Sequence, residues 1–189
     1  LKDGKPARTV AVAPEDMRFW KGLQLLTQKP VLFVANVDEA SAAGGNAYSG
    51  RVEEAARREG AAFVAISARI ESEIAPLDDA EQKEFLDAIG LEEPGLNRLI
   101  REAFRLLGLQ TYFTAGPKEA RAWTIPVGAT APQAAGVIHT DFERGFIRAE
   151  TIAYDDYVRL NGEVGAKEAG KMRLEGKEYV VKDGDVMLF

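Results

Sequence analysis

The chain has 189 residues, 46% of them hydrophobic, and its 24 basic and 30 acidic side chains give a net charge of −6. This length allows one large core or two small ones. The acidic balance gives no support for polyanion binding by the surface as a whole, and we expect no DNA partner. The absence of cysteine excludes disulfides, thiolate catalysis and cysteine zinc sites. No apolar run is long enough for a membrane span and no signal peptide opens the chain, so we expect a cytoplasmic protein without a membrane partner.

The first segment predicts a connector followed by a helix. Residues 1–13 show no clear period, and they start at Leu1 without an initiator Met, which suggests a fragment of a longer protein. Pro14, with two acids after it, is a favourable helix start. Apolar residues at Phe19, Leu23 and Leu26 then predict a helix to about residue 27.

Two apolar runs predict buried strands at 31–35 and 61–66. The segment between them predicts a helix that is capped by Ser49 and ends at Gly60. A strand, a helix and a strand in this order form a parallel βαβ unit, so the fold class of the first half is α/β. Helices at 78–89 and 95–107 follow, the second with a complete core-facing stripe.

The pattern changes after Gly108 to short alternating elements, which predict a separate α+β unit. The expected strands are 109–114, 120–127, 146–153, 171–175, 179–181 and 186–189, with helices at 130–137 and 154–160. The last two strands are joined by Lys182-Asp-Gly-Asp185, a hairpin signal.

Polar residues follow both strands of the βαβ unit. Asn36 to Glu39 come after the first strand and Ser67-Ala68 after the second. Because the carboxyl ends of parallel strands meet at one edge of a sheet, where ligands bind, these residues are candidates for a binding site. An asparagine amide can pair with the N6/N7 edge of adenine. Alternatively, Asn36 and Asp38 only turn the chain, a role that both residue types favour.

The segment Asn36-Val37-Asp38-Glu39 resembles the base-recognition motif of GTPases, Asn-Lys-x-Asp, and Ser67-Ala68 resembles its companion motif. Val37 replaces the lysine and Glu39 the aspartate that pairs with guanine. An unpaired buried polar group costs about 1–3 kcal/mol, so we expect guanine preference to fall sharply.

Other chemistry is missing from the sequence. A Gly-x-x-x-x-Gly-Lys-Ser/Thr motif, which would cradle phosphates, does not occur. These 189 residues alone are therefore not expected to hydrolyse ATP. For His139, the one histidine, we favour a structural role over catalysis, and we assign no catalytic residue.

Longer stretches resemble the YchF family of Obg-like ATPases, which are P-loop proteins. They are 29–39, Ile66-Ser-Ala68, Ala135 to Ala149 and Lys182 to Phe189. The resemblance implies that residues 1–13 are a connector from a helical insert and that residues 14–107 are the C-terminal part of the nucleotide-binding G domain. It also implies that residues 109–189 form a TGS-like β-grasp domain.

The resemblance also implies a function. It implies binding of ATP and its hydrolysis to ADP, with ATP preferred over GTP, Mg²⁺ held by residues before Leu1, and association with the ribosome. Asn36, Val37, Ser67 and Ala68 would contact the base, with Glu39 as a positional match. The alternatives are a non-catalytic module that binds RNA, the ribosome or a protein, and a GTP-binding protein of the same family.

Overall fold

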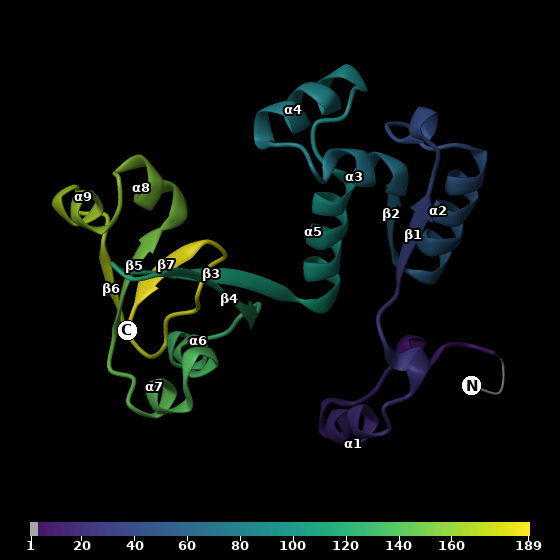
Figure 1. Cartoon of the computed structure of the whole chain (residues 1–189). Coiled ribbons are helices and arrows are strands. Elements are labelled where there is room, and N and C mark those ends of the chain that lie inside the picture. The colour runs from purple at the N-terminus through teal and green to yellow at the C-terminus, as the bar shows by residue number, and fades with distance from the viewer. Residues whose placement is uncertain (1–3) are drawn as a thin grey trace. The chain divides into compact units, whose positions relative to one another are not determined.

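A computed structural model describes residues 4–189 of the protein. The chain divides into two compact units, Leu1–Leu107 and Gly108–Phe189, and each is described by itself (Figure 1). None of the helices in the described part of the chain combines the length and the apolar composition that crossing a membrane requires.

The first unit is built on two parallel strands between helices. It contains η1 (Ala7–Thr9), η2 (Pro14–Asp16), α1 (Met17–Gly22), η3 (Leu26–Gln28), β1 (Leu32–Asn36), η4 (Glu39–Ser41), α2 (Ala47–Glu59), β2 (Ala62–Ile66), α3 (Ala68–Ile74), α4 (Asp79–Ala88) and α5 (Gly95–Leu107). β1 and β2 pair in parallel, with Leu32 opposite Ala62 and Asn36 opposite Ile66. Figure 1 shows the two strands between α2 and α5. The predicted βαβ unit is confirmed.

The helix predicted from Pro14 to about residue 27 is wrong. It is broken into η2, α1 and η3, because the backbone turns after Gly22 and Gln24 adopts a positive φ of 47°. The apolar stripe that suggested the helix is exposed, with Phe19 at 77% and Leu26 at 79%.

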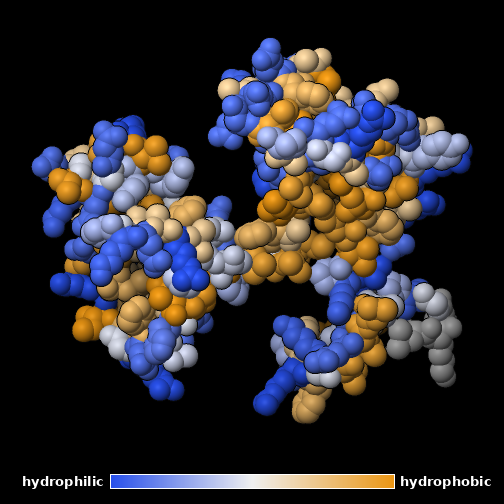
Figure 2. Space-filling view, viewed as in Figure 1, coloured by the Kyte–Doolittle hydropathy of each residue, from blue (hydrophilic) through white to orange (hydrophobic). Residues whose placement is uncertain are grey.

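Two burial predictions for this unit are also wrong. Val34 of β1 is 44% exposed, so this strand is not buried on both faces, and in α5 the stripe residues Leu96, Ile100 and Leu107 are exposed. Hydrophobic residues accordingly gather on the surface over the strands and α5 of this unit (Figure 2). The apolar pattern identified these elements correctly, but part of their apolar face is exposed to solvent.

The start of α2 differs from the prediction by three residues. Its N-cap is Asn46, whose side-chain oxygen accepts hydrogen bonds from Tyr48 N and Ser49 N, both at 3.0 Å. Ser49 is not the N-cap, but its Oγ accepts a second hydrogen bond, from Asn46 N at 2.8 Å. This reciprocal pair is a capping box. Gly60 ends the helix in the left-handed conformation, as predicted.

The second unit is a five-stranded mixed sheet with helices. It contains β3 (Leu109–Ala115), β4 (Ala120–Pro126), α6 (Ala131–Ile138), α7 (Thr140–Arg144), β5 (Ala149–Ala153), α8 (Tyr154–Arg159), α9 (Glu163–Glu168), β6 (Arg173–Glu175) and β7 (Asp185–Leu188). The strand order is β4-β3-β7-β5-β6, and only β3 and β7 are parallel. This is the small α+β unit expected from the sequence pattern, with the β-grasp arrangement that the family resemblance implies.

The core of this unit lies between the sheet and α6. Tyr112 of β3 is fully buried and its hydroxyl donates to Ala134 O at 2.8 Å. Ile125, Ala131 and Met187 pack in the same cluster. The hydrogen bond satisfies the polar end of a ring that contributes a large apolar surface to the core.

The hairpin predicted between 179–181 and 186–189 is wrong. β7 has β3 on one side and β5 on the other, so both of its edges are occupied. Residues 179–181 pair instead with the chain at the start of α6, where Ala131 N donates to Tyr179 O at 2.8 Å and Val181 N to Ala129 O at 3.0 Å. The Asp-Gly turn forms, but it leads into the centre of the sheet.

Candidate purine-base site

The structure brings together the two polar segments that follow β1 and β2. Val37 N donates to Ile66 O at 2.8 Å and extends the strand pairing by one step. Beyond it, the Asn36 side-chain oxygen Oδ1 accepts a hydrogen bond from Ala68 N at 3.0 Å. Asn36 and Ser67-Ala68 therefore form one corner at the carboxyl ends of the parallel strands, where α/β folds bind ligands.

Two polar groups at this corner lack a protein partner among the described residues. Asn36 is exposed, and its amide nitrogen donates to no described group while Oδ1 is held by Ala68. Ser67 is only 3% exposed, and its Oγ is buried without a hydrogen bond. Buried hydroxyls usually have a partner, so this group indicates an incomplete polar environment.

The other residues predicted to contact a base are less available for that contact. Val37 is buried at 8% exposure, which leaves little of its side chain for contact with a ring. The Asp38 carboxylate accepts from Ser41 N at 2.9 Å and caps η4. The alternative of a turn residue is thus correct for Asp38, whereas Asn36 bridges two loops.

Glu39 is engaged by an arginine that the sequence analysis did not consider. Arg69 Nε lies 2.7 Å from Glu39 Oε1 and 3.2 Å from Glu73 Oε1. The hydrogen bond that Arg69 donates to Glu73, with the charges of both carboxylates, raises the pKa of Arg69 above its usual range. The position of Arg69 directly after Ser67-Ala68 was the available signal, but its partner depends on α3, which was not predicted.

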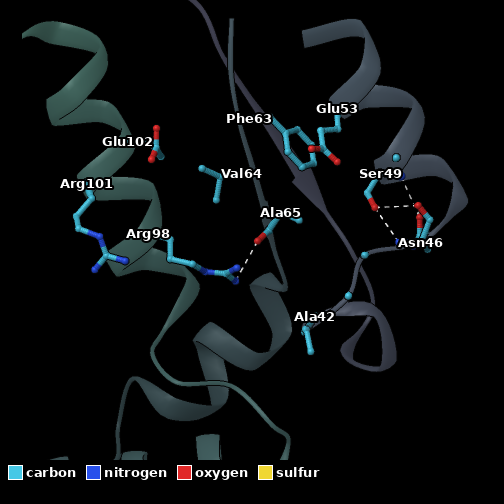
Figure 3. A pocket seen from close by; sticks show the side chains of 14 residues that line it. Ala42, Asn46, Ser49, Glu53, Phe63, Val64, Ala65, Arg98, Arg101 and Glu102 are labelled. Atoms are coloured by element: carbon cyan, nitrogen blue, oxygen red, sulfur yellow. Dashed lines mark hydrogen bonds between the residues drawn. The ribbon is translucent and has the colours of Figure 1, made fainter. Parts of the chain in front are cut away.

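A cavity of about 430 Å³ is lined by β2, by α2 with the loop before it, and by α5 (Figure 3). Arg98 reaches from α5 to β2, where its Nη2 donates to Ala65 O at 3.2 Å. Asn46 and Ser49 line the opposite wall with their mutual hydrogen bonds. Neither Asn36 nor Ser67 lines this cavity, so it is separate from the corner described above.

His139, the one histidine of the sequence, lies directly before α7. Its Nδ1 accepts from Asp141 N at 3.2 Å, which caps α7. The side chain is exposed and packs edge-on against Phe142.

Together, the parallel βαβ unit and the mixed sheet define the class of the protein. The fold is that of the C-terminal part of a P-loop NTPase followed by a small α+β unit. Among solved structures, the chain is similar to that of the Schizosaccharomyces pombe YchF GTPase, with a TM-score of 0.84 and 32% identity over 99% of this chain and 50% of that one. A GTP-binding protein from Pyrococcus horikoshii, 17% identical with a TM-score of 0.59 over 93% of this chain and 50% of that one, shares the fold.

Sequence comparisons give the family. Residues 109–189 match the family model YchF-GTPase_C, described as "Protein of unknown function (DUF933)". The chain is 58% identical over its whole length to a Ribosome-binding ATPase YchF from Pasteurella multocida, and 54% identical over 98% of its length to one from Bacillus subtilis. It covers 52% and 51% of these two relatives, about half of their length. The chain belongs to the YchF family.

Proposed function

We propose that the chain is the base-binding part and the carboxyl-terminal domain of a ribosome-associated P-loop ATPase, which hydrolyses ATP to ADP and prefers ATP to GTP. In this proposal residues 14–107 end the nucleotide-binding G domain and 109–189 form its TGS-like domain. Residues 1–13 connect the G domain to a helical insert, and Leu1–Asp3 of this connector lie outside the described residues.

The observation that carries the proposal is the hydrogen bond between Asn36 Oδ1 and Ala68 N at 3.0 Å. It restrains the orientation of the Asn36 amide, whose nitrogen has no partner among the described residues. An amide has two donor hydrogens and two acceptor lone pairs, so Asn36 can still donate to adenine N7 and accept from its N6 amino group.

The triphosphate and Mg²⁺ would be held by residues that this chain does not contain, since it has no phosphate-cradling motif. The open hydrophobic surface over the strands and α5 supports this division, because additional strands of a G domain would cover it (Figure 2). Bound Mg²⁺ would stabilise the negative charge that develops during phosphoryl transfer.

Ribosome binding is proposed from the relatives, several of which carry the name Ribosome-binding ATPase YchF. A protein that associates with ribosomes would act in the cytoplasm. Because the fission-yeast relative is called a GTPase, GTP is the competing nucleotide to test.

The experiment measures binding of ATP and GTP to the full-length protein by titration calorimetry, for the wild type and for Asn36→Ala. We expect the wild type to bind ATP more tightly than GTP. Loss of the amide should weaken ATP binding by about ten- to a hundredfold, the effect of removing a paired polar group. Asn97→Ala, which removes an exposed asparagine from α5, is the matched control and should bind as the wild type does.

Equal ATP affinity in the wild type and Asn36→Ala would contradict the base site. Tighter binding of GTP than ATP by the wild type would contradict the nucleotide preference and leave a GTP-binding member of the family.

A further inference from the structure

Two links join the loops that follow β1 and β2. The first is the hydrogen bond from Ala68 N to Asn36 Oδ1, and the second is the ion pair between Arg69 and Glu39, with Nε and Oε1 2.7 Å apart. Each partner of the second link lies close in sequence to a partner of the first. The carboxylate at the end of the base-recognition segment is therefore oriented by the residue after the Ser-Ala pair.

We propose that Arg69 is a positioning residue that selects against guanine by engaging the Glu39 carboxylate in an ion pair, so that this carboxylate is not free to pair with the base. This inference rests on the proposed function, because it assumes that Asn36 and Ala68 border the base.

The selection follows from the different edges of the two purines. Guanine presents N1–H and N2–H donors, which need an acceptor such as a carboxylate, whereas adenine has an acceptor at N1. A Glu39 carboxylate that accepted from guanine would have to share or break its ion pair with Arg69, so the ion pair adds a cost to guanine binding. Adenine has no use for the carboxylate and leaves the ion pair intact.

The size of the effect is limited by solvent. The side chain of Arg69 is 74% exposed and that of Glu39 is 47% exposed, and exposed ion pairs contribute little. Glu73 also holds Arg69, at 3.2 Å, and keeps the guanidinium beside Glu39. We therefore expect a change of about two- to fivefold, in keeping with an exposed pair.

The test measures KM and kcat of the full-length protein for ATP and for GTP. Arg69→Ala should lower the KM for GTP by about two- to fivefold and leave the KM for ATP unchanged. Arg69→Lys, which keeps the charge, should restore the wild-type ratio of the two KM values. Arg57→Ala removes an exposed arginine that is paired with Glu53 on α2, and it should have no effect.

A fourth comparison separates positioning from general damage. In a Glu39→Gln background, Arg69→Ala should no longer change the ratio of the KM values for GTP and ATP, because the carboxylate that Arg69 positions is gone. Equal changes for ATP and GTP in Arg69→Ala, or the same effect with and without Glu39, would overturn the inference while ATP binding stands. A wild-type protein that binds neither nucleotide would overturn the proposed function and this inference together.

Discussion

Position 95 has no space for a side chain larger than that of glycine. Gly95 begins α5, where its N–H donates to Glu71 Oε1 at 2.7 Å and Leu96 N donates to Glu71 Oε2 at 3.2 Å. A carboxylate at a helix start satisfies unpaired N–H groups and interacts favourably with the helix dipole. A Cβ at Gly95 would lie 2.9 Å from both Glu71 Oε1 and Ile66 Cγ2. The close approach of α3, β2 and α5 thus requires glycine.

We expect Gly95→Ala to lower the free energy of unfolding of the first unit by about 1–3 kcal/mol, because the added methyl group forces Glu71 and Ile66 apart. Gly50→Ala in α2 is the matched control, since its Cβ would meet nothing within 4 Å. That change should be neutral or stabilise by about 1 kcal/mol, through better helix propensity. Hydrogen exchange of the amides of each helix measures both effects. A Gly95→Ala protein as stable as Gly50→Ala would contradict the crowding.

At the same scale, sequence reasoning identified the Asn36–Ala68 corner because parallel strand ends meet at one edge of a sheet. It did not identify the ion pair of Glu39 with Arg69. The partner of a long, exposed side chain depends on the local path of the chain, here on η4 and α3. Neither short helix has a strong sequence pattern.

At the scale of elements, β7 is held in place by a polar network at its start. The Tyr179 hydroxyl donates to Asp185 Oδ2 at 2.7 Å and accepts from Arg173 Nη2 at 3.0 Å, and Lys182 N donates to the same carboxylate oxygen at 2.9 Å. Asp185 is buried, so these donors are needed to offset its desolvation. Burial, with the hydrogen bond to Asp185, raises the pKa of Tyr179 to about 12.

A raised pKa in the folded state means that folding favours the protonated phenol. Unfolded tyrosine ionises near pH 10, so this contribution to stability is complete below that pH and is lost as the pH rises to about 12. We expect the stability of the second unit to fall over this range, and Tyr179→Phe to reduce the pH dependence. At neutral pH, Tyr179→Phe should destabilise by about 1–3 kcal/mol because Asp185 loses a donor. Urea unfolding followed by circular dichroism at a series of pH values provides the measurement.

Tyr154→Phe serves as the control, since Tyr154 is exposed. Tyr112, whose pKa burial also raises, keeps part of the alkaline dependence in every variant. Parallel loss of stability by the wild type and Tyr179→Phe between pH 10 and 12 would contradict the network's role.

Most elements with a strong local pattern were predicted correctly, and the helix expected from Pro14 to about residue 27 is the exception. The apolar runs of β1 and β2 and the glycine stops of α2 and α5 gave bounds within a residue or two. The short helices α3, α7 and α9 were missed, because five to seven residues carry too little periodicity. The predicted pairing partner of residues 179–181 was wrong, because pairing within a sheet depends on contacts distant in sequence, which no local turn signal encodes.

At the scale of the whole molecule, the chain corresponds to about half the length of its relatives. The exposed apolar surface over the strands and α5 was not predicted, because a periodic stripe shows which side of a helix is apolar and not what covers it. The family resemblance, carried by long matching segments, identified the fold class correctly. The proposed base site combines both kinds of inference: the strand ends predict its place, and residue identity suggests its ligand.

The central claim is that the Asn36–Ala68 corner binds a purine, and a crystal structure of the full-length protein with a non-hydrolysable ATP analogue tests it most directly. We predict that the adenine N6/N7 edge lies within hydrogen-bonding distance of the Asn36 amide, with Arg69 still paired to Glu39. An adenine ring bound elsewhere, with the Asn36 amide free, would contradict the account.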